Sequence, residues 1–253
     1  MANGGGRCGA ALEGAGFRAH YARMSDAESS IYPVDIRGVA LEIEEFTQSQ
    51  ALGFILAELD ADAYGLDRIP FKPRDVVIDI GGHVGLFALY LARLHPGIAI
   101  YSFEPEARNF RHLAANIARN KALNVFAFNL AVTADGRPFE LYRPPDNSGA
   151  ANGYARNHAV HPRSLTPSVT LDEVFDRFVP RRCKLLKMDC EGAEHEILPA
   201  SKAALARVDW FSAEFHINEP LRQAGHSNEG LEAVVAQWIP AKRTAVSALA
   251  MSD

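Results

Sequence analysis

The apolar residues of this chain follow two alternating periods between residues 74 and 218. Short apolar runs typical of buried strands occur at 76–80, 98–103, 124–132, 184–188 and 210–215. Between these runs, apolar residues return every three or four positions, and 106–121 is the clearest such helical segment. Because strands alternate with helices, we expect an α/β fold with a doubly wound, mostly parallel sheet.

The first 73 residues do not share this pattern. Residues 1–30 are rich in Gly, Ala and Ser and show no sustained period, so we expect a flexible N-terminal arm. Residues 31–73 are expected to form a helical extension, because the apolar positions between 42 and 59 follow a mostly helical spacing. This extension either covers a ligand cleft or packs on the edge of the sheet. The main domain is expected to occupy residues 74–253.

Two later segments interrupt or extend the alternation. Residues 144–168 are rich in Pro, Gly, Asn and His without a period, and loops of this length in compact domains are usually functional or disordered. The next segment, 168–178, predicts a short amphipathic helix with Thr170 as its cap. Residues 230–239 predict a helix and 244–251 a further strand. We cannot find two clear strands for an antiparallel hairpin that would close the sheet after residue 220, so this C-terminal edge of the sheet stays unassigned.

The stretch VVIDIGGHVG, residues 76–85, indicates where a ligand binds. Its apolar run is broken by Gly81, Gly82 and Gly85, and a helical period begins directly afterwards. A strand, a tight glycine loop and a helix present backbone N–H groups and a positive helix end to a ligand. We therefore expect the loop to bind a nucleotide-like molecule. The alternative is a turn between strand and helix that binds nothing.

The spacing of the glycines narrows the choice of ligand. A dinucleotide loop requires glycine at the positions of His83 and Leu86, and no Gly-Lys-Ser/Thr follows for a phosphate-binding loop. The carboxylate of Asp79 at the strand end would suit an ammonium or a sulfonium group. The next strand ends at Glu104 and Pro105, about twenty residues further on, where an acidic side chain can hold a ribose diol.

Four blocks of the sequence together resemble one enzyme family. VVIDIGGHVG, YSFEP, NFRHLAANIARN and LLKMDCEGAEHEIL are similar to the FkbM-type S-adenosylmethionine-dependent methyltransferases over residues 74–218. The resemblance implies a Rossmann-like fold of the class I methyltransferase type. It also implies that the glycine loop holds the methionine part of the cofactor and that Glu104 binds its ribose. Where the family usually has Ala-Asn, this chain has Gly82-His83, so an imidazole would replace an amide.

The resemblance extends to the rest of the cofactor site. The adenine is expected near Asn129 and Ala131 at the end of the third strand, with backbone groups as contacts. The expected cofactor-binding residues are therefore Asp79, Gly81, Gly82, His83, Gly85, Glu104, Pro105, Asn129, Ala131 and Asp189.

A second centre of chemistry is expected where the fourth and fifth strands end. Asp189 and Glu191 follow the fourth strand, and Glu214 and His216 end the fifth. His216 is a candidate base because imidazole titrates near neutrality, with Asp189 or Glu191 as alternatives. Structural roles compete with these: an acid at a helix start for Glu191, a hydrogen-bond acceptor for Glu214 and a packed ring for His216. Asp189, Glu191 and Glu214 could also hold a divalent ion, but their spacing establishes no coordination shell and no metal is assigned.

The acceptor is expected to be a small molecule methylated on oxygen. No Asn/Asp-Pro-Pro-aromatic segment, which amino-group methyltransferases often use, follows the fourth strand. The resemblance implies a sugar, a polyketide or another secondary metabolite, and a carboxylate acceptor remains open. Tyr154 and His158 in the 144–168 loop, together with Glu214, are the expected substrate contacts, unless the two loop residues are simply solvated.

Composition excludes several other classes of protein. A chain of 253 residues with a net charge of −5 has no general attraction for nucleic acid or anionic membranes. Its three cysteines lack metal-ligand or CxxC spacing, and we find neither a spanning apolar run nor a signal core, so we expect a cytoplasmic protein. Oligomeric state is open. A nicotinamide-dependent oxidoreductase and a non-catalytic cofactor-binding or scaffold protein remain as alternatives to the methyltransferase.

Overall fold

The computed structural model of the protein describes residues 29–142 and 163–250. Its centre is a six-stranded sheet in which every neighbouring pair is parallel. The strands follow the order β12-β11-β10-β3-β4-β5 across the sheet. Their bounds are β3 (Val76–Ile80), β4 (Ala99–Phe103), β5 (Val125–Phe128), β10 (Cys183–Met188), β11 (Val208–Ile217) and β12 (Thr244–Ala250).

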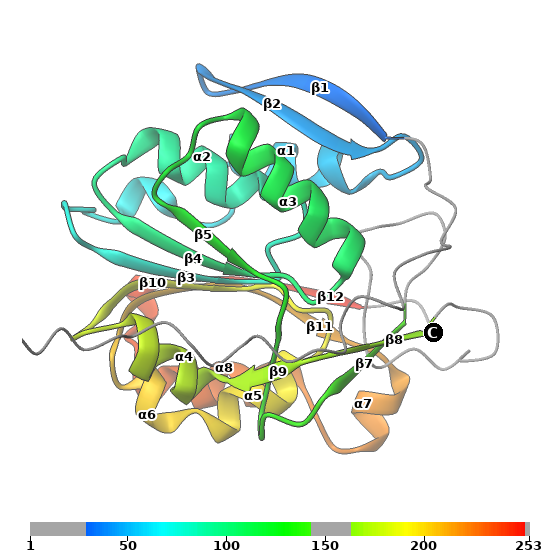
Figure 1. Cartoon of the computed structure of the whole chain (residues 1–253). Coiled ribbons are helices and arrows are strands. Elements are labelled where there is room, and N and C mark those ends of the chain that lie inside the picture. Colours follow the sequence, from blue (N-terminus) through cyan, green and yellow to red (C-terminus); the bar gives the residue numbers. More distant parts are fainter. Residues whose placement is uncertain (1–28, 143–162, 251–253) are drawn as a thin grey trace, which may run out of the picture.

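Helices cover both faces of this sheet, as Figure 1 shows. One face carries α1 (Ala51–Asp60), α2 (Leu86–Leu94) and α3 (Ala107–Arg119), and the other carries α4 (Leu171–Phe178), α5 (Glu194–Ala200), α6 (Lys202–Leu205) and α8 (Asn228–Ala236). The short helix α7 (Glu219–Gln223) follows β11. Each face has its own hydrophobic core, and all five residues of β3 are buried. The predicted doubly wound α/β fold is confirmed.

The order of the strands reverses between β3 and β10. From β3 the chain moves outward through β4 to β5, and it then returns to β10 and continues outward through β11 to β12. In open parallel sheets the crevice outside the carboxyl ends of the strands, at such a reversal, is where ligands bind. The glycine loop after β3 and the acidic segment after β10 therefore meet at this point.

The expected helical extension of residues 31–73 is wrong in its first part. Residues 29–46 form an antiparallel hairpin of β1 (Ser29–Ile36) and β2 (Val39–Phe46), and only α1 and the short 3-10 helix Leu66–Arg68 after it are helical. Buried and exposed positions alternate along β2 up to Ile43, which is a period of two. The turn residues Arg37 and Gly38 both have positive φ, 52° and 86°, as two-residue hairpin turns require.

The region around the long loop differs in part from the prediction. Residues 163–166 of the expected loop form β8 (Arg163–Thr166), which pairs with β7 (Phe139–Tyr142). The predicted third strand ends early at Phe128, and β6 (Ala131–Thr133) pairs instead with β9 (Ser168–Thr170). The predicted cap of α4 is confirmed, because the Thr170 hydroxyl accepts a hydrogen bond from the Glu173 backbone in a full capping box. Tyr154 and His158 lie outside the described residues.

The last strand closes the sheet without reversing direction. β12 runs parallel to β11, with Thr244 opposite Phe211 and Ala250 opposite Ile217. In the described part of the chain, this edge therefore has no antiparallel hairpin of the kind usual in methyltransferases. No helix among residues 29–142 and 163–250 is long and apolar enough to cross a membrane. The expected N-terminal arm lies outside the described residues up to Ser29.

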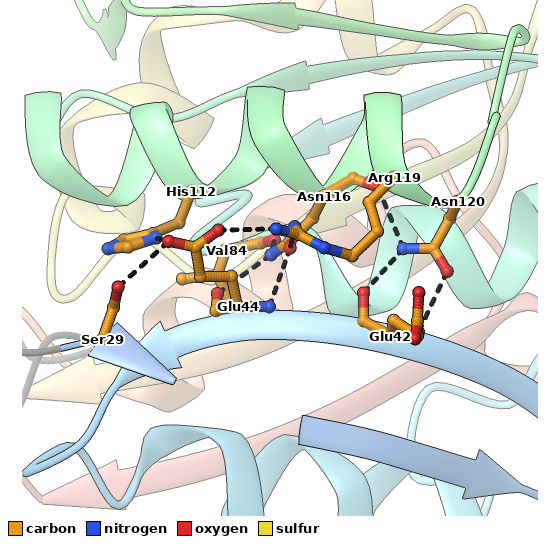
Figure 2. Close-up of polar contacts among 8 residues, drawn as sticks. All are labelled: Ser29, Glu42, Glu44, Val84, His112, Asn116, Arg119 and Asn120. Atoms are coloured by element: carbon orange, nitrogen blue, oxygen red, sulfur yellow. Dashed lines mark hydrogen bonds and ion pairs between the residues drawn. The ribbon is translucent and has the colours of Figure 1, made fainter. Parts of the chain in front are cut away.

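Asn116 of α3 and Asn120, which caps the end of this helix, hold the hairpin against the main domain (Figure 2). The side-chain amide of Asn116 accepts a hydrogen bond from the Glu44 backbone N–H (2.8 Å) and donates to the Glu44 carbonyl (3.0 Å). Asn120, one turn later, makes the same pair of bonds with Glu42 at 3.0 and 2.8 Å. Asn116 also donates to the Val84 carbonyl at 2.9 Å. The amides thus extend the ladder of β2 and connect it to the glycine loop.

We expect Asn116→Ala to lower the free energy of unfolding by about 2–4 kcal/mol, because it leaves the N–H and carbonyl of Glu44 and the carbonyl of Val84 without their partner. Urea unfolding monitored by circular dichroism measures this. Asn120→Ala is the comparison variant. It should lower the free energy of unfolding by less, because Asn120 has no bond to the glycine loop. Equal losses in the two variants would contradict the special place of Asn116.

Candidate active site

A cavity of about 320 Å³ opens at the carboxyl ends of the parallel strands. Its volume is in the range of small-molecule sites. Of the residues expected from the sequence, those that line it are Gly81, His83, Glu104, Pro105, Ala131, Asp189, Glu191, Glu214 and His216. The expected cofactor residues Asp79, Gly82, Gly85 and Asn129 are outside its lining. The structure therefore brings most of the expected residues together and places the others behind them.

Asp79 lies beneath the glycine loop. Its fully buried carboxylate accepts a hydrogen bond from the Ser102 hydroxyl at 2.6 Å, and the Lys187 Nζ is 3.4 Å from its Oδ1. The same ammonium group donates to the Gly81 carbonyl at 2.7 Å and is 3.6 Å from the Asp189 Oδ2. Burial raises the pKa of Asp79, and the charge of Lys187 opposes this shift. Lys187 thus joins the ends of β3 and β10 under the loop.

Gly82 and Gly85 let the loop pack closely against its neighbours. A Cβ atom on Gly82 would lie 2.2 Å from the Ser102 Oγ, and one on Gly85 would lie 2.5 Å from the Leu113 Cδ1. Gly85 also has a φ of 93° at the start of α2. In this structure both glycines serve the conformation of the loop, which rests on β4 and α3.

Glu104 supplies a buried carboxylate to the cavity. Its oxygens accept hydrogen bonds from the backbone N–H groups of His83 (2.7 Å) and Glu106 (2.8 Å). Burial raises the pKa of Glu104 to about 8, although these two donors lower it. Asn129 donates to the carbonyls of Glu104 and Pro105 at 2.9 and 3.1 Å, so it fixes the strand end from behind. Each carboxylate oxygen keeps a further lone pair for a ligand hydroxyl.

His83 links the glycine loop to the hairpin. It has a φ of 49°, and its Nε2 is 3.3 Å from the Oε2 of the buried Glu45 on β2. Burial lowers the pKa of His83 to about 3, so the ring is neutral. Glu45 could not be found from the sequence, because its partner lies on another element and the hairpin was not expected.

A group of ionisable side chains gathers where β10 and β11 end. The His216 Nε2 is 4.0 Å from the Asp189 Oδ1 and 3.8 Å from the Glu191 Oε2, and its Nδ1 is 3.6 Å from the Glu194 Oε1. Burial lowers the pKa of His216, but the surrounding carboxylates outweigh it and raise the pKa to about 10. Burial also raises the pKa of Glu191 to about 8 and that of Glu214 to about 7.

The loop after β10 is held by Glu194, which the sequence analysis missed. Its fully buried carboxylate accepts hydrogen bonds from the backbone N–H groups of Cys190 (2.7 Å) and Gly192 (2.8 Å). Glu191 between them has a φ of 55°, a conformation that is uncommon outside glycine and clusters at functional sites. This turn directs Glu191 to the cavity lining.

Three of these residues could hold a metal ion. Asp189, Glu214 and His216 each offer one ligand atom, and these atoms lie within 4.8 Å of one another. Carboxylate oxygen and imidazole nitrogen are ligands that divalent first-row metals accept.

Helix α1 and strand β7 form an apolar wall of the cavity. The wall consists of Phe54 and Ile55 from α1 and Phe139 and Leu141 from β7, with Glu58 as its acidic member. Phe54 is 63% exposed although it lines the cavity, so its ring is available to a ligand. The sequence predicts no contacts for Phe54 and Ile55, because their spacing does not decide which face of the extension meets the sheet.

Comparisons with known proteins found a family model and several relatives that match this chain. A model of the methyltransferase FkbM domain matches residues 79–223. The chain is 28% identical over 150 residues to "Methyltransferase 1" of Beauveria bassiana, which covers 52% of this chain and 60% of the relative. It is 35% identical over 69 residues to "31-O-demethyl-FK506 methyltransferase FkbM" of Streptomyces tacrolimicus, which covers 27% of this chain and 26% of the relative. The chain thus spans less than two thirds of either relative. Among solved structures, a putative transferase of Pyrococcus horikoshii has a TM-score of 0.43 at 13% identity and covers 84% of this chain and 62% of its own.

Proposed function

The chain belongs to the family of FkbM methyltransferases, and we propose that it transfers the methyl group of S-adenosylmethionine to a hydroxyl oxygen of a small molecule. The observation that carries the proposal is the buried carboxylate of Glu104, which lines the cavity beside the glycine loop. A carboxylate at the end of the second parallel strand is placed to accept both hydroxyls of a ribose. S-adenosylmethionine, once bound, supplies a methyl group activated by positive sulfur.

The residues of the cavity fit the parts of this cofactor. Glu104 is placed for the ribose diol, and the neighbouring Leu130, Ala131 and Val132 offer a surface for the adenine. Gly81 brings backbone close to the cavity on the side of Asp189, where a methionine ammonium would meet carboxylates. The cofactor would therefore extend from β4 toward β10, with its methyl group toward the acidic cluster.

The charge of the cavity favours a neutral or cationic acceptor. Glu58, Asp189, Glu191 and Glu214 all line it, and like charges brought together in a partly buried site repel one another. A carboxylate acceptor would have to enter against this repulsion. The apolar wall of α1 and β7 supports an acceptor with an apolar part beside its hydroxyl, as in a polyketide or another secondary metabolite.

The chain has two tasks in the reaction, to align the acceptor and to take its proton. Alignment alone can supply much of the rate acceleration of a displacement at carbon. Asp189, Glu191 and His216 line the same end of the cavity. The carboxylates are the proposed proton acceptors, because the pKa of about 10 keeps the His216 ring protonated near neutral pH.

Two alternatives predict different ligands. A nicotinamide-dependent oxidoreductase would bind NAD, although the glycine spacing of its loop is missing here. A non-catalytic cofactor-binding or scaffold protein would bind S-adenosylmethionine without turning it over with any acceptor. The family match argues against both.

Calorimetric titration with S-adenosylmethionine and S-adenosylhomocysteine tests the proposal, with NAD as the comparison ligand. We expect saturable binding of both, and Glu104→Ala should weaken it by about 10- to 100-fold, because two hydrogen bonds to the ribose hydroxyls are lost at about 0.5–1.5 kcal/mol each. Glu232→Ala, which removes an exposed carboxylate of α8 outside the cavity, is the control and should bind normally. Binding of NAD alone would overturn the proposal.

A further inference from the structure

We propose that Asp189, Glu214 and His216 form a binding site for one divalent metal ion, such as Mn²⁺, in the wall of the cavity. The three side chains come from two neighbouring parallel strands, β10 and β11, and their position in the sheet is therefore fixed by the backbone. The ion would lie at the end of the cavity assigned to the acceptor. The site rests on the geometry of the side chains and is independent of any bound cofactor.

The separation of the ligand atoms fits a single ion. A divalent ion holds its ligands at about 2.1 Å, so atoms on opposite sides of it are about 4.2 Å apart. The three candidate atoms lie within 4.8 Å of one another. Neighbouring ligands of an octahedral ion are about 3.0 Å apart, so the side chains would have to move toward one centre by up to about 1 Å.

The Nε2 of His216 is a second observation that points to this site. The residue is only 4% exposed, and its other ring nitrogen, Nδ1, faces the Glu194 Oε1 at 3.6 Å. The Nε2 points to Asp189 and Glu191 at 4.0 and 3.8 Å, which is too long for a hydrogen bond. A buried polar group that makes no hydrogen bond costs free energy. A metal ion between the Nε2 and the carboxylates would give this nitrogen a partner.

The balance of charge also favours a cation. Asp189, Glu191 and Glu214 gather around the imidazole, whereas the nearby Lys187 is shared with Asp79 beneath the loop. Two carboxylates and one imidazole match an ion that accepts mixed oxygen and nitrogen ligands. The ion and a proton compete for His216, since only the neutral ring binds a metal.

The site also indicates the class of acceptor. Three protein ligands leave positions open on an octahedral ion. An acceptor with two neighbouring oxygens, such as a vicinal diol, could fill them, and the ion would orient it and lower the pKa of the reacting hydroxyl. This use of the ion rests on the proposed methyl transfer to oxygen, whereas its binding does not.

The experiment uses Mn²⁺ itself as the probe. The six-line electron paramagnetic resonance signal of free Mn²⁺ is measured while metal-free protein is titrated with Mn²⁺ at pH 8. We expect the protein to bind one ion per chain, seen as a loss of the free signal. The same protein preparations are titrated calorimetrically with S-adenosylmethionine, so that the proposed function is tested separately.

Two variants test the ligands. Glu214→Gln and His216→Gln should each weaken Mn²⁺ binding by about tenfold or more, since even loss of an outer partner of a metal ligand costs about 10–100-fold. Asp189 is not replaced, because the change would also unpair Lys187. Glu58→Gln removes a charge from the same cavity without removing a proposed ligand, and it should bind Mn²⁺ within about threefold of the unchanged protein.

The outcomes separate the two proposals. Loss of Mn²⁺ affinity in the two ligand variants but not in Glu58→Gln supports the site, whether or not S-adenosylmethionine binds. An unchanged free Mn²⁺ signal in the presence of folded protein overturns it, even if the cofactor binds normally. Equal weakening by Glu58→Gln also overturns it, because the cavity would then attract cations only by its net charge.

Discussion

Lys187→Met is expected to lower the free energy of unfolding by about 3–5 kcal/mol, the loss found when one partner of a buried ion pair is removed. The substitution keeps the length of the side chain but leaves the fully buried Asp79 without its cation. It also removes the donor of the Gly81 carbonyl, which Lys187 binds at 2.7 Å. Both losses fall on the strand ends that carry the glycine loop, so S-adenosylmethionine binding should weaken as well.

Urea unfolding measures the loss, and Lys184→Met is the matched control. Lys184 lies on the same strand and pairs with Asp75 at 3.7 Å, but the Asp75 side chain is 25% exposed, so this pair should contribute at most about 1 kcal/mol. The double variant Asp79→Asn/Lys187→Met should regain much of the stability, because the fully buried charge of Asp79 is then removed, and Asp189, which also loses Lys187, is 21% exposed. A loss in Lys187→Met no larger than in Lys184→Met would contradict the role of the buried pair.

The sheet could be predicted because each of its strands carries its own local signal. β3 reads as an unbroken apolar run, as a strand buried on both faces must. Helix α3 shows a stripe of apolar residues, and Thr170 with Glu173 forms a capping box that is visible in four residues of sequence. Each of these signals depends on neighbours within one or two turns, and packing only reinforces it.

The hairpin could not be predicted because distant contacts decide it. Ile43 and Phe46 are three positions apart, which suits one face of a helix, although Leu41 and Ile43 also fit a strand. The choice is made by Asn116 and Asn120, whose amides bind the backbone of β2 across more than 70 residues of sequence. The resemblance to a family marked these asparagines but not their partners.

The sequence predicted where the residues of the site lie more accurately than which atoms they contact. The sequence placed Asp79 at the correct strand end, but the direction of its side chain depends on Lys187, the buried one of two lysines in an otherwise apolar strand. That charge was the available signal, since a lysine in a buried strand needs a partner. The positions of Asp189, Glu214 and His216 near strand ends were enough to predict that they line one cavity. The distances between their ligand atoms could be obtained only from the folded structure.

Gly81→Ala is expected to abolish cofactor binding and to lower the free energy of unfolding by roughly 2–6 kcal/mol, the sum of backbone strain and overpacking. Gly81 has a φ of 81°, and a Cβ atom there would lie 1.7 Å from the Asp189 carbonyl oxygen. That oxygen belongs to the backbone of the strand end, so it cannot rotate away as a side chain would. The end of β3 must therefore separate from that of β10, and the cavity between them is deformed.

Gly38→Ala separates the clash from the strain. Gly38 has a similar φ of 86°, but a Cβ atom there meets nothing within 4 Å, so only the strain of about 1–2 kcal/mol remains. Thermal unfolding and S-adenosylmethionine titration of both variants measure the difference. Because Gly38 lies in the hairpin turn, its variant should bind the cofactor normally. Equal losses of stability in the two variants, with normal cofactor binding in both, would contradict this prediction. The close packing of Gly81 against the Asp189 backbone would then not be required for the shape of the cavity.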